Sequence, residues 1–138
     1  MKPRNVKLVS AGAFALAALG VAIFVSAPVR EACAAGPEIL SYKDDVAPIF
    51  RGYCVSCHHP GGEGTAQSGL DLTTYAGLMK GSKFGPMVVP GSPETSNLMW
   101  LLDWRASPEM RMPHGKKKLP VCEREIISDW IRQGAKDN

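Results

Sequence analysis

Two cysteines and a histidine stand together near the middle of the chain, as Cys54-Val55-Ser56-Cys57-His58. Thiols three positions apart lie on one helical turn, and His58 lies four positions after Cys54 on the same side. This C-x-x-C-H (CXXCH) pattern is the attachment signature of c-type haem, in which the thiols add to the vinyl groups and the histidine binds the iron. The sequence therefore predicts one covalent haem c on Cys54 and Cys57, with His58 as the proximal iron ligand.

Paired cysteines also occur in zinc half-sites, in thioredoxin-like redox pairs and in disulfides. Zinc would need a second Cys/His pair, and the only cysteine after this motif is Cys122, with no histidine beside it. A thioredoxin-like pair needs a βαβ context, which the sequence lacks. Because only one C-x-x-C-H is present, a multi-haem relay is excluded.

An iron held by one histidine needs a sixth ligand or keeps an open position. Met112 lies in a polar loop, and Pro113 after it restricts its backbone to an extended conformation outside any helix. Met112 is therefore the expected distal iron ligand, with Met110 and His114 as alternatives. The other methionines of this region lie in or near apolar helix faces, where packing explains them: Met79, Met87 and Met99.

Binding of the iron by both His58 and Met112 leaves no coordination position for a substrate. This argues against oxygenase, peroxidase and gas-sensor chemistry and for outer-sphere electron transfer. The thioether also raises the reduction potential relative to two histidine ligands. We expect His58 to donate its other ring N–H to a backbone carbonyl, which would fix the orientation of the ring.

The elements predicted around these residues are helices and loops. Ser41-Tyr42-Lys43-Asp44 resembles a capping box, and Pro48 must lie in the first turn of the following helix or bend it. A polar, glycine-rich loop is expected over residues 61–69, and a short helix over residues 73–80, ended by Gly81. The apolar face of the first helix has helical spacing: Val46, Ile49, Phe50 and Tyr53.

In the second half, Ser92 is expected to cap a helix with Pro93 at its first position. Residues 107–119 are expected to be irregular, and a last helix is expected over residues 120–133, ended by Gly134. No stretch alternates with period 2, so the predicted fold is all-α, with about four short helices and long loops around one haem. The apolar faces of these two helices are Leu98, Leu101 and Leu102 for the first, and Ile126, Ile127, Trp130 and Ile131 for the last.

The start of the chain has the pattern of a secretory signal peptide. Residues 1–7 are basic, the 22 residues 8–29 carry no charge, and Ala32-Cys33-Ala34 supplies small residues for cleavage. The expected domains are therefore a signal peptide over residues 1–34 and a haem c domain over residues 35–138. An uncleaved membrane anchor is the alternative, because 22 residues are enough to span a bilayer. Either way, the domain is expected outside the cytoplasmic membrane, in the periplasm.

The formal net charge of +3 comes from this leader. Residues 1–34 hold four of the 16 basic side chains and one of the 13 acidic ones, which leaves 12 of each in the remainder. A nucleic-acid partner therefore loses its main support. Lys116, Lys117 and Lys118 form a local run of positive charge, which is either a docking patch for acidic redox partners or a solvated loop.

The chain resembles the class I, single-haem c-type cytochromes over about residues 41–135. The resemblance rests on Asp45-Val46-Ala47-Pro48-Ile49-Phe50 before the C-x-x-C-H motif, on Arg111-Met112-Pro113, and on Trp130-Ile131-Arg132-Gln133-Gly134-Ala135. Val89-Pro90-Gly91-Ser92-Pro93-Glu94 is similar to a segment of the bacterial branch found with dehydrogenases and multi-domain haem proteins. The resemblance implies His58 and Met112 as the axial pair. It also implies that the first and last helices cross, so that Ile49, Phe50 and Tyr53 meet Ile127, Trp130 and Ile131.

The predicted function is electron transport in the periplasm, with one electron carried between redox partner proteins and no enzymatic activity. The alternatives are a haem subunit of a larger dehydrogenase or oxidase complex, and a haem enzyme or gas sensor with a labile sixth ligand. Cys122 has no place in either the motif or the resemblance. It is expected to be a buried lone thiol, and the alternatives are a bond to Cys33 or a link between two molecules.

Overall fold

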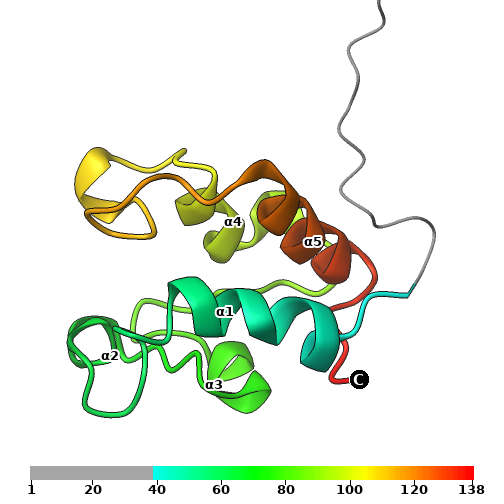
Figure 1. Ribbon diagram of the computed structural model, residues 1–138, viewed down its shortest axis with the longest axis horizontal. Coiled ribbons are helices and arrows are strands. Elements are labelled where there is room, and N and C mark those ends of the chain that lie inside the picture. The colour runs from blue at the N-terminus through cyan, green and yellow to red at the C-terminus, as the bar shows by residue number, and fades with distance from the viewer. Residues whose placement is uncertain (1–38) are drawn as a thin grey trace, which may run out of the picture. The chain divides into compact units, whose positions relative to one another are not determined.

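Helices and loops build residues 39–138, the part of the chain that this computed structural model describes (Figure 1). No strand occurs among these residues, and the only bridge there is an isolated one between Ser82 and Gly85. This confirms the all-α fold. The predicted leader, residues 1–34, lies outside the described range. Within residues 39–138, no helix is both long and apolar enough to cross a membrane.

Five α-helices and three short π- or 3-10-helical turns follow one another along residues 39–138. In the view of Figure 1, α4 and α5 lie on one side of α1, and α2 and α3 lie on the other. The elements are η1 (Tyr42–Val46, π-helical), α1 (Ala47–Tyr53), α2 (Glu63–Ser68), α3 (Tyr75–Lys80), η2 (Pro93–Thr95, 3-10), α4 (Asn97–Leu102), η3 (Pro108–Met110, 3-10) and α5 (Val121–Arg132).

The first helix begins at the predicted cap, in a modified form. The Ser41 hydroxyl accepts a hydrogen bond from the Asp44 N–H at 3.2 Å, and the Asp45 carboxylate accepts from the Ser41 N–H at 2.7 Å. The reciprocal carboxylate is therefore one residue later than the capping box predicted. The wider turn of η1 accounts for this shift, since the Val46 N–H reaches back five residues to the Ser41 carbonyl. Pro48 lies in the first turn of α1, as expected.

The apolar face of this helix is buried except at its end. Val46, Ile49 and Phe50 are buried, whereas Tyr53 is 37% exposed. The Tyr53 hydroxyl donates to the Glu123 carboxylate at 3.4 Å, so the polar end of its ring lies at the surface. Tyr53 therefore lies at the exposed end of the predicted apolar face, outside the buried core.

A helix, α2, occupies most of the stretch that was expected to be a loop. Gly62 precedes it in an extended conformation and Gly69 ends it at φ 75°, a left-handed conformation that glycine adopts without a steric penalty. Inside the helix, the Ser68 hydroxyl donates to the Gly64 carbonyl at 2.5 Å, and the Gln67 amide donates to the Glu63 carboxylate at 3.1 Å. The flanking glycines are thus the ends of a helix, and α2 has no buried residue whose periodicity could have predicted it.

The helix predicted from Ser92 is divided into η2 and α4. Ser96 between them is extended and almost completely buried. Its hydroxyl donates to the Ser92 carbonyl and accepts from the Val89 N–H, at 2.8 and 2.9 Å. These bonds satisfy a buried hydroxyl and hold the chain in the break. In α4 the predicted apolar residues Leu98 and Leu102 are buried.

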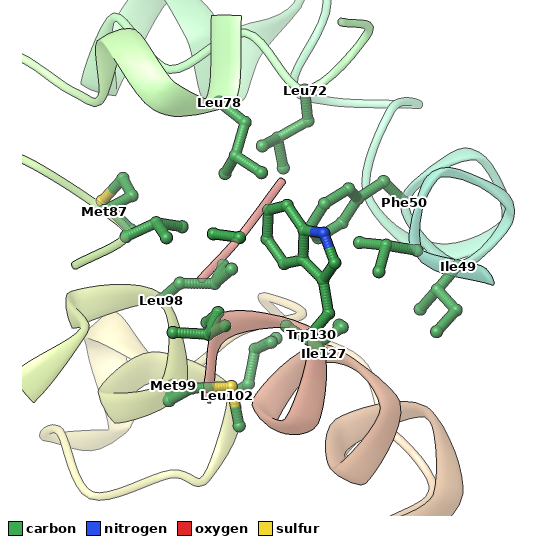
Figure 2. Packing of buried hydrophobic residues seen from close by; sticks show 14 of the residues in the cluster. Ile49, Phe50, Leu72, Leu78, Met87, Leu98, Met99, Leu102, Ile127 and Trp130 are labelled. Atoms are coloured by element: carbon green, nitrogen blue, oxygen red, sulfur yellow. The ribbon is translucent and has the colours of Figure 1, made fainter. Parts of the chain in front are cut away.

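The core joins α5 to the first helix and to α3. Trp130 is fully buried, and its ring centroid lies 5.6 Å from that of Tyr42 and 6.4 Å from that of Tyr75. Figure 2 shows Phe50 of α1 beside the Trp130 indole, with Ile127 on the same helix as Trp130. The predicted buried stripe of the last helix is confirmed at Ile127, Trp130 and Ile131.

Candidate haem-binding site

The C-x-x-C-H motif continues the path of α1 by one further turn. The Cys54 N–H donates to the Phe50 carbonyl at 2.9 Å, and the Cys54 carbonyl accepts from the N–H groups of Cys57 and His58 at 3.1 and 3.0 Å. Bonds to the third and fourth following residues are those of a helical turn. One turn therefore carries both thiols and places His58 on the side of Cys54.

The two thiols differ in their surroundings. Both are free, but Cys57 is exposed while Cys54 is half-buried against the hydrophobic core. Burial raises the pKa of the Cys54 thiol to about 11, and the positive charge of Lys116 acts in the opposite direction. Cys54 therefore stays protonated at neutral pH. In the part of the chain described here, no three His, Cys, Asp or Glu side chains are arranged to hold one metal ion.

His58 is oriented by a backbone carbonyl, as the sequence predicts. Its Nδ1 lies 3.3 Å from the carbonyl oxygen of Leu70. A carbonyl oxygen only accepts hydrogen bonds, so Nδ1 carries the proton and Nε2 keeps the lone pair that a metal requires. The backbone of His58 is held as well, because its carbonyl accepts a hydrogen bond from the Leu72 N–H at 2.9 Å.

Helix α2 covers one face of the His58 ring. A Cβ placed on Gly64 would lie 2.9 Å from both Cε1 and Nε2 of the imidazole, closer than real Cβ atoms approach other atoms. Only glycine therefore lets the helix come this close. The Thr65 N–H donates to the Cys57 carbonyl at 3.2 Å and ties α2 to the motif. Two free thiols and an imidazole with a fixed ring and an available Nε2 fit the donor set of a c-type haem.

The backbone of Met112 is fixed at both of its polar groups. Its N–H donates to the Leu101 carbonyl at 3.3 Å, and its carbonyl accepts from the Trp104 indole N–H at 2.9 Å. The Met112 side chain is half-buried against the core, whereas Met110 is 56% exposed and His114 is exposed. Among the predicted candidates for a distal ligand, Met112 is thus the one whose position is set by packing. Met87 and Met99 are buried in the core, as predicted.

Arg124 of α5 anchors both ends of the segment that carries Met112, residues 103–119. Its Nη1 pairs with the Asp103 carboxylate at 2.5 Å, and its Nε donates to the Leu119 carbonyl at 3.0 Å. Lys118 adds a third bond, from Nζ to the Asp103 carbonyl at 2.8 Å. This segment, drawn in yellow and orange, and α2 lie toward the same end of the domain in Figure 1.

The lysine run is therefore not uniform. Lys116 and Lys117 are exposed, whereas Lys118 is half-buried and its ammonium group is bound to the Asp103 carbonyl. The positive charge that is free to meet a partner in this run is that of Lys116 and Lys117.

Sequence reasoning missed the residues that support the two candidate ligands. Gly64 contacts the His58 ring because it has no side chain, and Leu70 acts through its backbone carbonyl. Only the density of glycines around position 64 could have indicated a close approach. Trp104 offers a clearer signal, since a tryptophan in the polar stretch Asp103-Trp104-Arg105 has no helical face to fill.

Cys122 is disulfide-bonded, so the expectation of a lone buried thiol is wrong. The alternative that pairs it with Cys33 falls on a residue outside the described range.

The described residues are all-helical, and the C-x-x-C-H turn directly follows α1, an arrangement that is consistent with a small cytochrome-like fold. In a comparison with known families, residues 54–114 match the family model described as Planctomycete cytochrome C. The matched stretch is less than half of the chain, and it contains Cys54, Cys57, His58 and Met112. No curated protein and no solved structure matches the chain. The family match supports covalent haem c and haem-based electron transfer rather than enzymatic activity.

Proposed function

We propose that this protein is an exported carrier of single electrons, with one haem c attached through Cys54 and Cys57 and bound at the iron by His58 and Met112. The observation that carries the proposal is the fixed His58 ring. Its Nδ1 bond to Leu70 and its close contact with Gly64 leave Nε2 as the available donor. When bound, the haem supplies the iron that gains and loses one electron.

The protein's own residues would hold both ligands of the iron. The Leu70 carbonyl accepts from His58 Nδ1, and the Trp104 indole donates to the Met112 carbonyl, so both ligands would be held in place and little would have to move when the charge of the iron changes. With His58 and Met112 both bound to it, the iron would have no position open for a substrate. The electron comes from one redox protein and passes to another at the surface, through small and weak contacts.

The ligand assignment is tested by an optical spectrum of the full-length protein with bound haem. Met112→Ala is expected to abolish the methionine–iron charge-transfer band of the ferric protein. Met110→Ala is the matched control, because Met110 is a neighbouring but exposed methionine. Retention of the band in Met112→Ala would contradict the assignment, and ready binding of carbon monoxide by the ferrous wild type would favour the enzyme or sensor alternative.

We also propose that Lys116 and Lys117, the exposed part of the lysine run, form a docking patch for an acidic redox partner. Electrostatic steering makes the rate of association with an acidic redox partner depend on ionic strength. Changing both lysines to Gln is expected to slow transfer to the partner at low salt and to flatten the salt dependence. Lys118→Gln is the matched control, since its ammonium group is already bound to Asp103. An unchanged rate and salt slope in the double variant would contradict the docking patch.

A further inference from the structure

The carbonyl oxygen of Leu70 is shared by two donors. His58 Nδ1 lies 3.3 Å from it, and the Thr65 hydroxyl donates to it at 2.8 Å. A carbonyl oxygen has two lone pairs and can accept both hydrogen bonds. The Thr65 bond is the shorter of the two, so the hydroxyl is the dominant donor to this oxygen, and the histidine bond is long for its type.

Thr65 is held in this position by its own backbone. Its N–H donates to the Cys57 carbonyl at 3.2 Å, within the C-x-x-C-H turn. Gly64, the residue before it, lies against the His58 ring, where a side chain would not fit. Helix α2 thus packs directly against the ring of His58. The Thr65 hydroxyl donates to the Leu70 carbonyl, the same oxygen that accepts from His58 Nδ1.

Sharing of this acceptor changes the relative stability of ferric and ferrous iron in one direction. When the second N–H of a metal-bound histidine is strongly accepted, the ring becomes more basic and stabilises the more highly charged metal ion. A second donor draws electron density from the same carbonyl, because hydrogen bonds in one network polarise one another. The Thr65 hydroxyl therefore weakens the His58 bond and favours ferrous iron.

Resting on the haem ligation proposed above, we propose that Thr65 tunes the reduction potential of this site upward by competing with His58 for the Leu70 carbonyl. Thr65 touches neither the iron nor the haem in this account, so it is a positioning residue that acts through His58. Helix α2 buries no apolar side chain of its own. This role of Thr65 would explain why the helix nevertheless packs against the His58 ring.

The test is the midpoint potential of the intact protein with bound haem, measured beside the nuclear magnetic resonance signal of the His58 Nδ1–H in the ferrous state. Thr65→Val keeps the branched shape and the backbone N–H but removes the hydroxyl. It is expected to lower the potential, by about a fivefold shift toward ferric iron at a fixed applied potential. The Nδ1–H signal is expected to move downfield as its hydrogen bond strengthens.

Two further variants of Thr65 and one control variant complete the test. Thr65→Ser retains the hydroxyl and is expected to keep both wild-type values, and Thr65→Ala is expected to lower the potential as Thr65→Val does. Thr95→Val is the control for loss of a threonine hydroxyl, because that hydroxyl bonds only within the exposed turn at Ser92. Haem-loaded Thr65→Val and Thr65→Ala with the wild-type potential and Nδ1–H signal would overturn this inference alone. Absence of covalent haem from the wild type would overturn the proposed function and this inference with it.

Discussion

The indole N–H of Trp104 donates to the carbonyl oxygen of Met112 at 2.9 Å. Trp104 itself has a φ of 59°, an uncommon left-handed conformation for a bulky residue. The Arg111 guanidinium lies over its ring, 5.4 Å from the centroid, and donates from Nε to the Ala106 carbonyl. The turn from Trp104 to Met112 is therefore closed by the side chains of Trp104 and Arg111, and the candidate distal ligand lies at its end.

Trp104→Phe is expected to loosen Met112 without removing it. An aromatic ring is kept at position 104, but the Met112 carbonyl loses a hydrogen bond worth about 1 kcal/mol. This corresponds to about a fivefold change in the equilibrium constant for release of Met112 from the iron. Displacement of the methionine by added imidazole, followed through the methionine–iron band, measures this change. Trp100→Phe is the control, because Trp100 is 47% exposed and stacks on Arg105. Equal imidazole affinity in Trp104→Phe and wild type would contradict the role of this bond.

Arg124→Ala is expected to destabilise the domain by about 1.5–3 kcal/mol, because it removes charge-assisted bonds to Asp103 and to the Leu119 carbonyl. Urea unfolding of the haem-loaded protein measures the free energy. Arg132→Ala is the matched control. Arg132 pairs with Asp129 and Glu94 but is 53% exposed, so its loss is expected to cost less than about 1 kcal/mol. Equal losses of unfolding free energy in the two variants would contradict a larger stabilising role for the Arg124 bonds to residues 103–119.

Two glycines in helices of the same half of the domain should respond in opposite ways to alanine. At Gly64 the new Cβ would meet the His58 ring, so Gly64→Ala is expected to cost about 1–3 kcal/mol through overpacking and to disturb the spectrum of the haem. Gly52 in α1 has open space around it, so Gly52→Ala is expected to be neutral or to stabilise by up to about 1 kcal/mol. Thermal unfolding with parallel spectra compares the two variants. A neutral Gly64→Ala would argue against the close seating of α2 on the histidine.

The fold was predictable wherever an element buries a periodic apolar face. The last helix is the clearest case, because Ile127, Trp130 and Ile131 are spaced for one face and all are buried. Helix α2 lacks such a face, and its flanking glycines resemble those of a loop, so its sequence gave no basis for predicting it. The break at Ser96 was also invisible in the sequence, since it depends on bonds from a buried hydroxyl to the distant Val89 and to Ser92.

The candidate site divides in the same way. Cys54, Cys57 and His58 follow from spacing within one turn, which is a local property of the chain. Leu70 and Trp104 act through a backbone carbonyl and an indole N–H brought close by tertiary packing, and no spacing rule indicates such partners. The sequence predicted that a carbonyl would hold His58, but only the fold identifies it as that of Leu70.

Tyr42 provides a pH dependence at alkaline pH. Burial, reinforced by the negative charge of Asp137, raises the pKa of its phenol above the ordinary value of 10.0. The fold therefore favours the neutral phenol, and this contribution to stability is complete below pH 10 and is lost as the pH rises through the raised pKa. Stability of the wild type is expected to fall more steeply above pH 10 than that of Tyr42→Phe, as measured by urea unfolding at a series of pH values. Parallel curves of stability against pH for the wild type and Tyr42→Phe would contradict a raised pKa of Tyr42.

Covalent attachment of haem at Cys54 and Cys57 is the central claim, and mass spectrometry of the denatured protein tests it most directly. The full chain is produced in cells that export it and carry haem attachment machinery. The polypeptide is expected to exceed the mass of its own amino acids, counted with or without residues 1–34, by the mass of one haem. The double variant Cys54→Ala, Cys57→Ala is expected to lose this increment. A wild-type polypeptide that carries no haem mass after denaturation would contradict the account.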